Sequence, residues 1–211
     1  MSSIDLAALD PRSRYKLLCA VVIPRPIAWV TTESKSGIVN AAPYSFFNVF
    51  GQDPALIVLG LENREGGEPK DTTRNIRDTG EFVVNILTPD LAAPMVETAA
   101  PYPADIGEPD TLGLSLAASA RVAPPRLAAA PVALECRKMV SLSFSAEREL
   151  LVGEALHLHA RDGLIDEDTL RVEWGDDLPL ARLFADRYAR LVETDRHTIP
   201  DPRTKAGSDA V

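Results

Sequence analysis

The 211-residue chain has few cysteines, no run of basic residues and no long apolar segment. Cys19 and Cys136 are too few for a disulfide framework, and their apolar surroundings are typical of buried free thiols. No segment approaches the roughly 18 apolar residues needed to span a bilayer. Residues 1–18 lack the apolar core and the cleavage site of a signal peptide. We therefore expect a cytoplasmic protein that does not enter a membrane.

An excess of positive charge is also missing. The chain has 22 Lys and Arg against 31 Asp and Glu, a net charge of −9, which on average repels nucleic acid and anionic membranes. We expect neither as a partner. The hydrophobic content of 45% is that of a globular domain with a sizeable core. We expect one domain over residues 1–195 and, because the last stretch is polar and contains proline, a flexible tail over residues 196–211.

Short apolar segments between turn residues predict a mainly β fold. Strands are expected at residues 19–31, 54–61, 81–87, 131–137, 139–145 and 150–160. The continuous apolar run 54–61 suits a strand buried on both faces. Pro24 and Pro26 cannot donate to a ladder, so an edge or a bulge is expected there. Ser36 and Gly37 predict a hairpin turn.

Helices are predicted to be few and peripheral. They are expected at residues 72–79, 90–99 and 178–192, the last from its helical spacing of apolar residues. Asp71 can cap the first helix, and Gly80 can end it. Residues 100–111 form a loop longer than most connections, which favours a functional role. Short strands with a few helices indicate a β-barrel with peripheral helices.

The motif KDTTRN at residues 70–75 places Lys70 and Thr72 at the start of a predicted helix. A helix N-terminus has unpaired N–H groups and a partial positive charge, so it attracts phosphate. Lys70 adds a full charge, and Thr72 adds a hydroxyl donor. Alone, the motif favours an ordinary capped surface helix, because such helices are common and short motifs have high false-positive rates.

A second motif precedes it at residues 24–47, with the sequence PRPIAWVTTESKSGIVNAAPYSFF. It contains an apolar strand, a Gly turn and a polar-aromatic run. Taken singly, its aromatic residues suit a core and its polar residues suit turns. Taken with the motif at 70–75, it suits a flat apolar ring that has polar edges and a phosphate tail.

The succession of motifs resembles the flavin reductase-like family of FMN-binding split barrels. The matching segments are PRPIAWV at 24–30, NAAPYSFFN at 40–48, KDT at 70–72 and GEFVVN at 80–85. Looser matches follow at Pro131, 134–136, 152–154, 182–183 and Tyr188. The strong motifs lie between Tyr15 and Asn85.

This resemblance implies a split β-barrel and a homodimer with flavin sites near the subunit interface. It implies FMN or FAD as the flavin, NADH or NADPH as co-substrate, and hydride transfer between them, with a separate monooxygenase as one recipient of reduced flavin. It also implies flavin contacts by Arg25, Ile27, Trp29, Thr31, Thr32, Asn40, Ala41, Pro43, Ser45, Phe46, Lys70, Asp71, Thr72 and Asn75. Two other functions stay open: a non-catalytic flavin carrier, and a flavoenzyme with tightly held FMN that acts on another substrate.

Hydride transfer between two cofactors needs no protein nucleophile, and the chain has no convincing triad or paired-carboxylate motif. His157 and His159 lie two residues apart on a predicted strand, so we expect them to share a face with Gly153 and Ala155. A zinc site needs a third ligand, and neither C-x-x-C nor HExxH accompanies the pair, so no metal is expected. His157 is a candidate for tuning hydride transfer.

Overall fold

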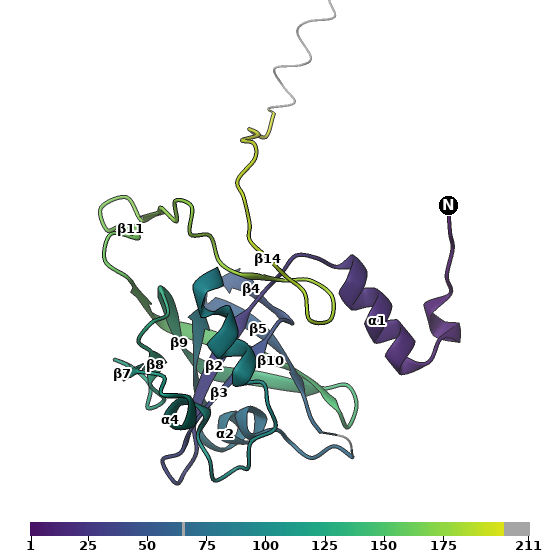
Figure 1. Ribbon diagram of the computed structural model, residues 1–211, viewed down its shortest axis with the longest axis horizontal. Helices are drawn as coiled ribbons and strands as arrows, with labels where there is room; N and C mark the ends of the chain where they lie inside the picture. The colour runs from purple at the N-terminus through teal and green to yellow at the C-terminus, as the bar shows by residue number, and fades with distance from the viewer. Residues whose placement is uncertain (65, 201–211) are drawn as a thin grey trace, which may run out of the picture.

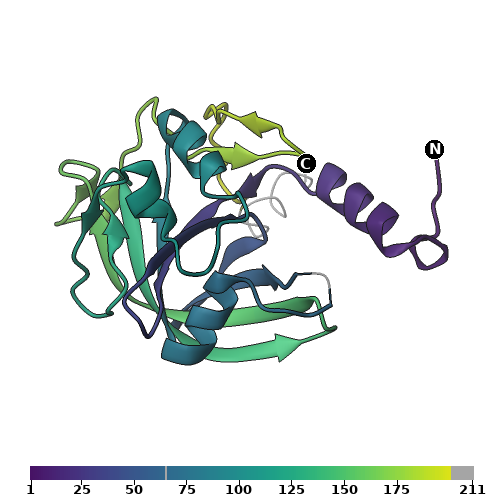
Figure 2. The same ribbon diagram turned by 60° about the horizontal axis from the view of Figure 1, so that its bottom comes forward.

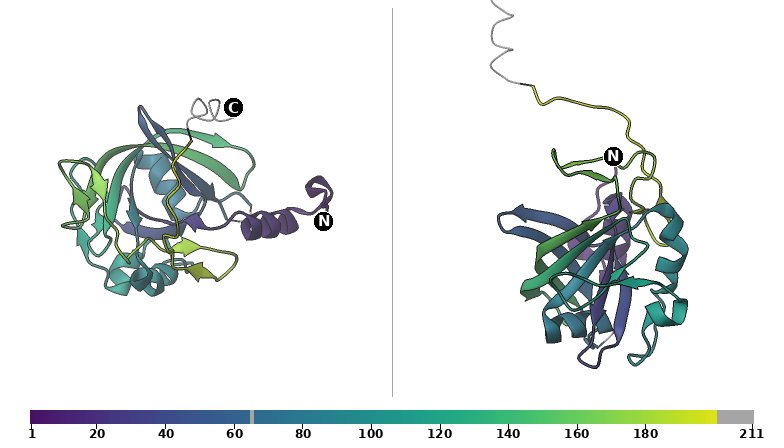
Figure 3. Two further views of the ribbon diagram at one scale, coloured as in Figure 1. Left: turned by 90° about the horizontal axis from the view of Figure 1, so that it is seen from above. Right: turned by 90° about the vertical axis from the view of Figure 1, so that its left-hand side faces the viewer.

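A seven-stranded antiparallel sheet organises the fold in the computed structural model, which describes residues 1–64 and 66–200. The strand order is β3-β2-β6-β9-β10-β5-β4, and the sheet curls on itself into a barrel (Figure 1 and Figure 3). Its strands are β2 (Ala28–Glu33), β3 (Val39–Tyr44), β4 (Phe47–Gln52), β5 (Ala55–Glu62), β6 (Glu81–Ile86), β9 (Val132–Ser143) and β10 (Arg148–Ala160). The predicted mainly β barrel is confirmed.

The barrel is split between β3 and β4, which are consecutive in the chain and form the two edges of the sheet. Ser45 and Phe46 link them. The N–H of Gly60 on β5 donates to the Phe46 carbonyl at 2.6 Å. A Cβ at position 60 would lie 2.7 Å from the Phe46 Cβ, so glycine permits this approach. We call the Ser45–Phe46 link and the facing end of β5 the seam.

Alternation along the strands builds two apolar clusters on opposite sides of β2. Ala28 and Val30 point into the barrel, where they pack with Phe82, while Trp29 belongs to an outer cluster with Leu127. Strand β5 also alternates, with one face buried and the other half-buried. The predicted strand at 54–61 is thus confirmed, but its predicted burial on both faces is wrong.

Helices lie around the barrel as expected (Figure 2). They are α1 (Pro11–Val21), α2 (Asp71–Thr79), α3 (Ala92–Glu97), α4 (Glu108–Leu112) and the 3-10 turns η1 (Leu6–Ala8) and η2 (Pro89–Leu91). Gly80 ends α2 with a φ of 77°, as predicted. Lys70, not Asp71, is the N-cap residue. The Asp71 carboxylate instead pairs with Arg64 and Arg74.

Several predicted boundaries are wrong. Cys19 lies in α1, whose N-cap Asp10 accepts from the Ser13 N–H, so no strand begins at residue 19. The short strand β1 (Arg25–Pro26) is separated from β2, in agreement with the predicted break at the prolines. The helix α4 occupies part of the predicted loop 100–111. The two strands expected at 131–137 and 139–145 form one strand, β9.

The helix predicted at 178–192 is also wrong. This segment forms a hairpin of β13 (Ala181–Arg182) and β14 (Tyr188–Ala189), and β13 pairs with β1. Ala185 has a φ of 57°, which a helix does not allow. The remaining short strands are β7 (Leu116–Ala117), β8 (Arg126–Leu127), β11 (Ile165–Asp166) and β12 (Arg171–Val172). Of the predicted tail, residues 196–200 have no regular structure, and 201–211 lie outside the described residues.

No helix among the described residues is both long and apolar enough to cross a membrane.

Candidate functional site

A cavity of about 440 Å³ opens at the seam, within the range of about 300–1,000 Å³ typical of cofactor sites. It lies between the end of β3, the seam, the N-terminus of α2 and the segment 98–102. Its lining residues are Tyr15, Asn40, Ala42, Pro43, Tyr44, Ser45, Phe46, Gly60, Glu62, Arg64, Lys70, Asp71, Thr72, Thr98, Ala99, Ala100, Pro101, Tyr102, Glu108 and Arg148. We call it the seam cavity.

The structure brings the two predicted motifs together at this cavity. The predicted flavin contacts that line it are Asn40, Pro43, Ser45, Phe46, Lys70, Asp71 and Thr72. Asn75 and Thr32 lie beneath, where the Asn75 amide donates to the buried Thr32 hydroxyl at 3.0 Å. Motifs that are separate in the sequence thus form one site.

The other predicted contacts have side chains engaged within the protein. The Arg25 guanidinium donates to the carbonyls of Cys19 and Leu183 at 2.6 and 2.8 Å. The Trp29 indole donates to the Thr98 hydroxyl at 3.0 Å. The remaining ones are Thr31, which donates to a backbone carbonyl at 2.6 Å, and the core residues Ile27 and Ala41. Flavin contacts by these residues stay a prediction.

A buried polar network forms one wall of the seam cavity. The Asn40 amide donates to both carboxylate oxygens of Glu108 at 2.8 Å, and the Ala41 N–H donates to the same group at 2.9 Å. The Thr72 hydroxyl donates to the side-chain carbonyl oxygen Oδ1 of Asn40 at 2.7 Å. Burial raises the pKa of Glu108 above its ordinary value. The network holds Asn40 and Thr72 in one orientation.

Cations and carboxylates alternate along the rim near α2. Lys70 Nζ lies 3.3 Å from Glu62, and Arg148 contacts the same carboxylate at 2.8 Å. Arg64 pairs with Asp71 at 3.0 Å. The first N–H groups of α2 have no partner inside the helix. A phosphate can therefore meet helix N–H groups and nearby cations here, in competition with Glu62 for Lys70.

Aromatic rings also border the cavity, next to Arg148. Tyr15 of α1 lies 6.1 Å from Phe46, centroid to centroid, and the Arg148 guanidinium lies over both rings at 5.4 and 5.9 Å. The Tyr44 hydroxyl is buried without a hydrogen-bond partner among the described residues. Burial raises the pKa of Tyr44 to about 12, so this hydroxyl is a neutral donor.

Sequence reasoning missed several of these residues. They are Tyr15, Glu62, Arg64, Glu108, Arg148 and the segment 98–102. Tyr15, Glu108 and Arg148 reach the seam cavity from distant parts of the chain, whereas Glu62 and Arg64 lie between the two motifs. The one available signal was the unusual length of the predicted loop 100–111, which contains Glu108.

The two histidines lie away from the seam cavity. A bulge between Ala155 and His157 shifts the register of β10 against β9. Ala155 pairs with the core residue Cys136, whereas His157 pairs with Glu135, which faces the other side of the sheet. The predicted shared face with Gly153 and Ala155 is therefore wrong. Neither histidine lines the seam cavity, so the geometry gives no support to His157 as a tuning residue.

Comparison with known proteins places this geometry in context. The model of the family described as "Flavin reductase like domain" matches residues 21–192. The structure of 2-nitrobenzoate 2-nitroreductase NbaA from Pseudomonas fluorescens is similar, with a TM-score of 0.86 and 36% identity over 94% of this chain and 96% of that chain. Nitrilotriacetate monooxygenase component B from Bacillus cereus gives a TM-score of 0.87 and 33% identity over 93% and 98% of the two chains. An uncharacterized protein of Deinococcus radiodurans is 42% identical, covering 80% of this chain and 76% of its own.

Proposed function

The chain belongs to the flavin reductase-like domain family, and from this premise we propose that it is an oxidoreductase that transfers hydride from NADH or NADPH to FMN or FAD. The observation that carries the proposal is the seam cavity. It combines a platform of backbone and aromatic groups at residues 42–46 with the N-terminus of α2. A flavin needs both, because its ring is flat and largely apolar while its tail is anionic.

The residues present fit a flavin. Tyr44 offers a buried hydroxyl that has no partner among the described residues, as expected of a donor that a ligand satisfies. The volume of about 440 Å³ is enough for a cofactor-sized ligand. Lys70 and the first N–H groups of α2 would hold the phosphate, and the segment 42–46 would contact the ring.

The bound flavin would supply the hydride-accepting chemistry. The chain itself would have to bind the flavin, orient it and shield it from water. Asn40 is fixed by Glu108 and Thr72, which gives this wall of the cavity one defined shape. The segment 98–102 lines the cavity, where it would limit the access of water to a bound flavin. Because burial keeps the Tyr44 hydroxyl protonated, it can donate a hydrogen bond to a bound flavin.

Three functions would use the same site, and the proposed reductase is one of them. The relative NbaA is named a nitroreductase, which favours a flavoenzyme that keeps its FMN and reduces another substrate. The other relative is named a monooxygenase component, which favours a reductase that passes reduced flavin to a partner. A third possibility, a flavin carrier without turnover, needs the cavity but no nicotinamide.

The experiment is a steady-state assay of NADH and NADPH oxidation, with and without added FMN or FAD. Oxidation that depends on added flavin supports the reductase. Stoichiometric FMN retained through purification, together with turnover only when a nitroaromatic acceptor is present, supports the flavoenzyme. Flavin binding without any nicotinamide oxidation supports the carrier, and absence of binding contradicts all three.

We also propose that the protein is a homodimer, as the family resemblance implies. Helix α1 and the tip of the β9–β10 hairpin lie on the same side of the barrel (Figures 1 and 2). Both expose large apolar side chains, including Val21, Val22 and Phe144, which are 71%, 60% and 74% exposed. Such surfaces are typical of association sites. A second subunit here would lie close to Tyr15 and Arg148 at the seam cavity.

A further inference from the structure

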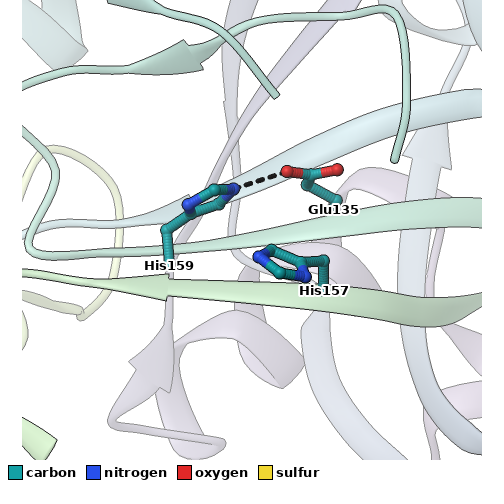
Figure 4. A group of neighbouring side chains, drawn as sticks. All are labelled: Glu135, His157 and His159. Carbon is teal, nitrogen blue, oxygen red and sulfur yellow. Dashed lines mark hydrogen bonds and ion pairs between the residues drawn. The ribbon is translucent and has the colours of Figure 1, made fainter. Parts of the chain in front are cut away.

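We propose that Glu135, His157 and His159 form a binding site for a divalent transition-metal ion of the zinc type, separate from the seam cavity. We call it the His–His–Glu cluster (Figure 4). Each residue offers one ligand atom, and these atoms all lie within 4.8 Å of one another. The inference does not depend on the proposed flavin chemistry.

Strand pairing builds the cluster. His157 and His159 are two apart on β10, so their rings project from the same face, and the ring centroids are 4.7 Å apart. His157 pairs directly with Glu135 on β9, next to the bulge that turns this part of β10 outward. The third ligand thus comes from a neighbouring strand, which is why the sequence spacing of the histidines did not reveal it.

Glu135 is held as metal-ligating carboxylates usually are, by hydrogen bonds from outside the ligand set. Its side chain is fully buried, and its two oxygens accept the N–H groups of Ala120 and Arg121 at 2.7 and 2.6 Å. These two donors fix both carboxylate oxygens, so Glu135 is held in one orientation before a metal ion binds.

His159 already contacts this carboxylate, with Nε2 2.5 Å from Oε1. In the metal-free protein the contact pairs the carboxylate with a histidine proton. A metal ion would replace that proton between the two groups and would draw in the exposed ring of His157. Only side-chain rotation is needed, because the β9–β10 ladder already sets the backbone positions.

The donor set favours zinc. Two imidazoles and one carboxylate are a common three-residue ligand set for Zn²⁺, with the fourth position open to water or a ligand. His157 is exposed, so that position would face solvent. A bound ion would connect β9 and β10 and, through Glu135, the segment 120–121.

The test is equilibrium dialysis of the tag-free, full-length protein against ZnCl₂, with metal analysis of the retained protein. We expect one zinc ion per chain. His157→Ala and His159→Ala should each weaken binding about tenfold or more, because each removes a ligand. His197, the remaining one of the three histidines, lies in the C-terminal segment, so His197→Ala is the matched control and should bind as wild type.

Glu135→Gln tests the carboxylate, because glutamine keeps the shape but removes the charge and one of the two acceptors of the Ala120 and Arg121 N–H groups. Binding should weaken in this variant as well. Thermal unfolding followed by circular dichroism checks that each variant is folded, and zinc should raise the melting temperature of wild type more than that of the variants. The proposal is wrong if wild type retains no zinc at tens of micromolar, or if folded histidine or Glu135→Gln variants bind it like wild type.

Discussion

The Glu108 carboxylate orients Asn40 at the wall of the seam cavity, although the two residues are far apart in the chain. Its folded-state pKa is raised above the ordinary value of 4.5 because the group is buried. Its contribution to the free energy of unfolding is therefore fully present below that value and is lost as the pH rises through the raised pKa.

Glu108→Gln isolates this effect, because glutamine does not titrate. We expect wild type to lose stability relative to Glu108→Gln as the pH rises above about 4.5, measured by urea unfolding across a pH series. A difference between the two proteins that stays constant with pH would contradict the assignment.

Lys70 is the predicted contact for a flavin phosphate. Replacing it with alanine removes a charge-assisted contact worth roughly 1.5–3 kcal/mol, so the affinity for FMN should fall about tenfold or more. Riboflavin has no phosphate, and its affinity should hardly change.

Fluorescence titration measures both affinities. Lys35→Ala is the control, because Lys35 also pairs with a carboxylate, that of Asp78, but does not line the seam cavity. An equal loss of FMN and riboflavin affinity in Lys70→Ala would mean that Lys70 acts through folding.

At the scale of elements, the sequence predicted turns and helix ends correctly, because interactions between neighbouring residues determine them. Gly37, with a φ of 82°, turns the β2–β3 hairpin, and Gly80 ends α2. The segment 178–192 has helical apolar spacing, but it forms a hairpin because β1, more than 150 residues earlier, offers strand pairing to Ala181. Glu108 and Asn40 are also separated in sequence, by 68 residues. Neither the strand pairing nor the Glu108–Asn40 contact can be predicted from a short stretch of sequence, because the partners are far apart in the chain.

The seam provides a prediction at this scale. Gly60→Ala would place a Cβ 2.7 Å from the Phe46 Cβ, and the link between β3 and β4 would have to move. We expect a loss of about 1–3 kcal/mol in the free energy of unfolding and weaker flavin binding.

Chemical denaturation and flavin titration measure the two effects. Gly51→Ala on β4 is the matched control, because its Cβ would meet its nearest neighbour at an ordinary 3.4 Å. Equal behaviour of the two variants would show that the seam tolerates a side chain at position 60.

At the scale of the whole molecule, the proposed dimer predicts a molar mass of twice 22.8 kDa by light scattering. Val22→Asp places a charge on the exposed apolar side near α1 and should shift the mass toward one chain, because a buried unpaired charge is costly.

Leu170→Asp is the control for this experiment. Leu170 is 77% exposed and directly precedes β12. Strand β12 pairs with β11, which lies on the side of the barrel away from α1 (Figure 1). A mass of one chain for wild type, or a shift in Leu170→Asp alone, would contradict the proposed interface.

The two buried thiols are probes of local and global unfolding. Cys136 lies in the barrel core, and burial raises its pKa to about 12, so a thiol reagent can modify it only after the barrel opens. Cys19 is covered where α1 meets Arg25, so it becomes accessible when this helix alone detaches. Mass spectrometry of timed labelling would separate the two rates, and we expect Cys19 to react first.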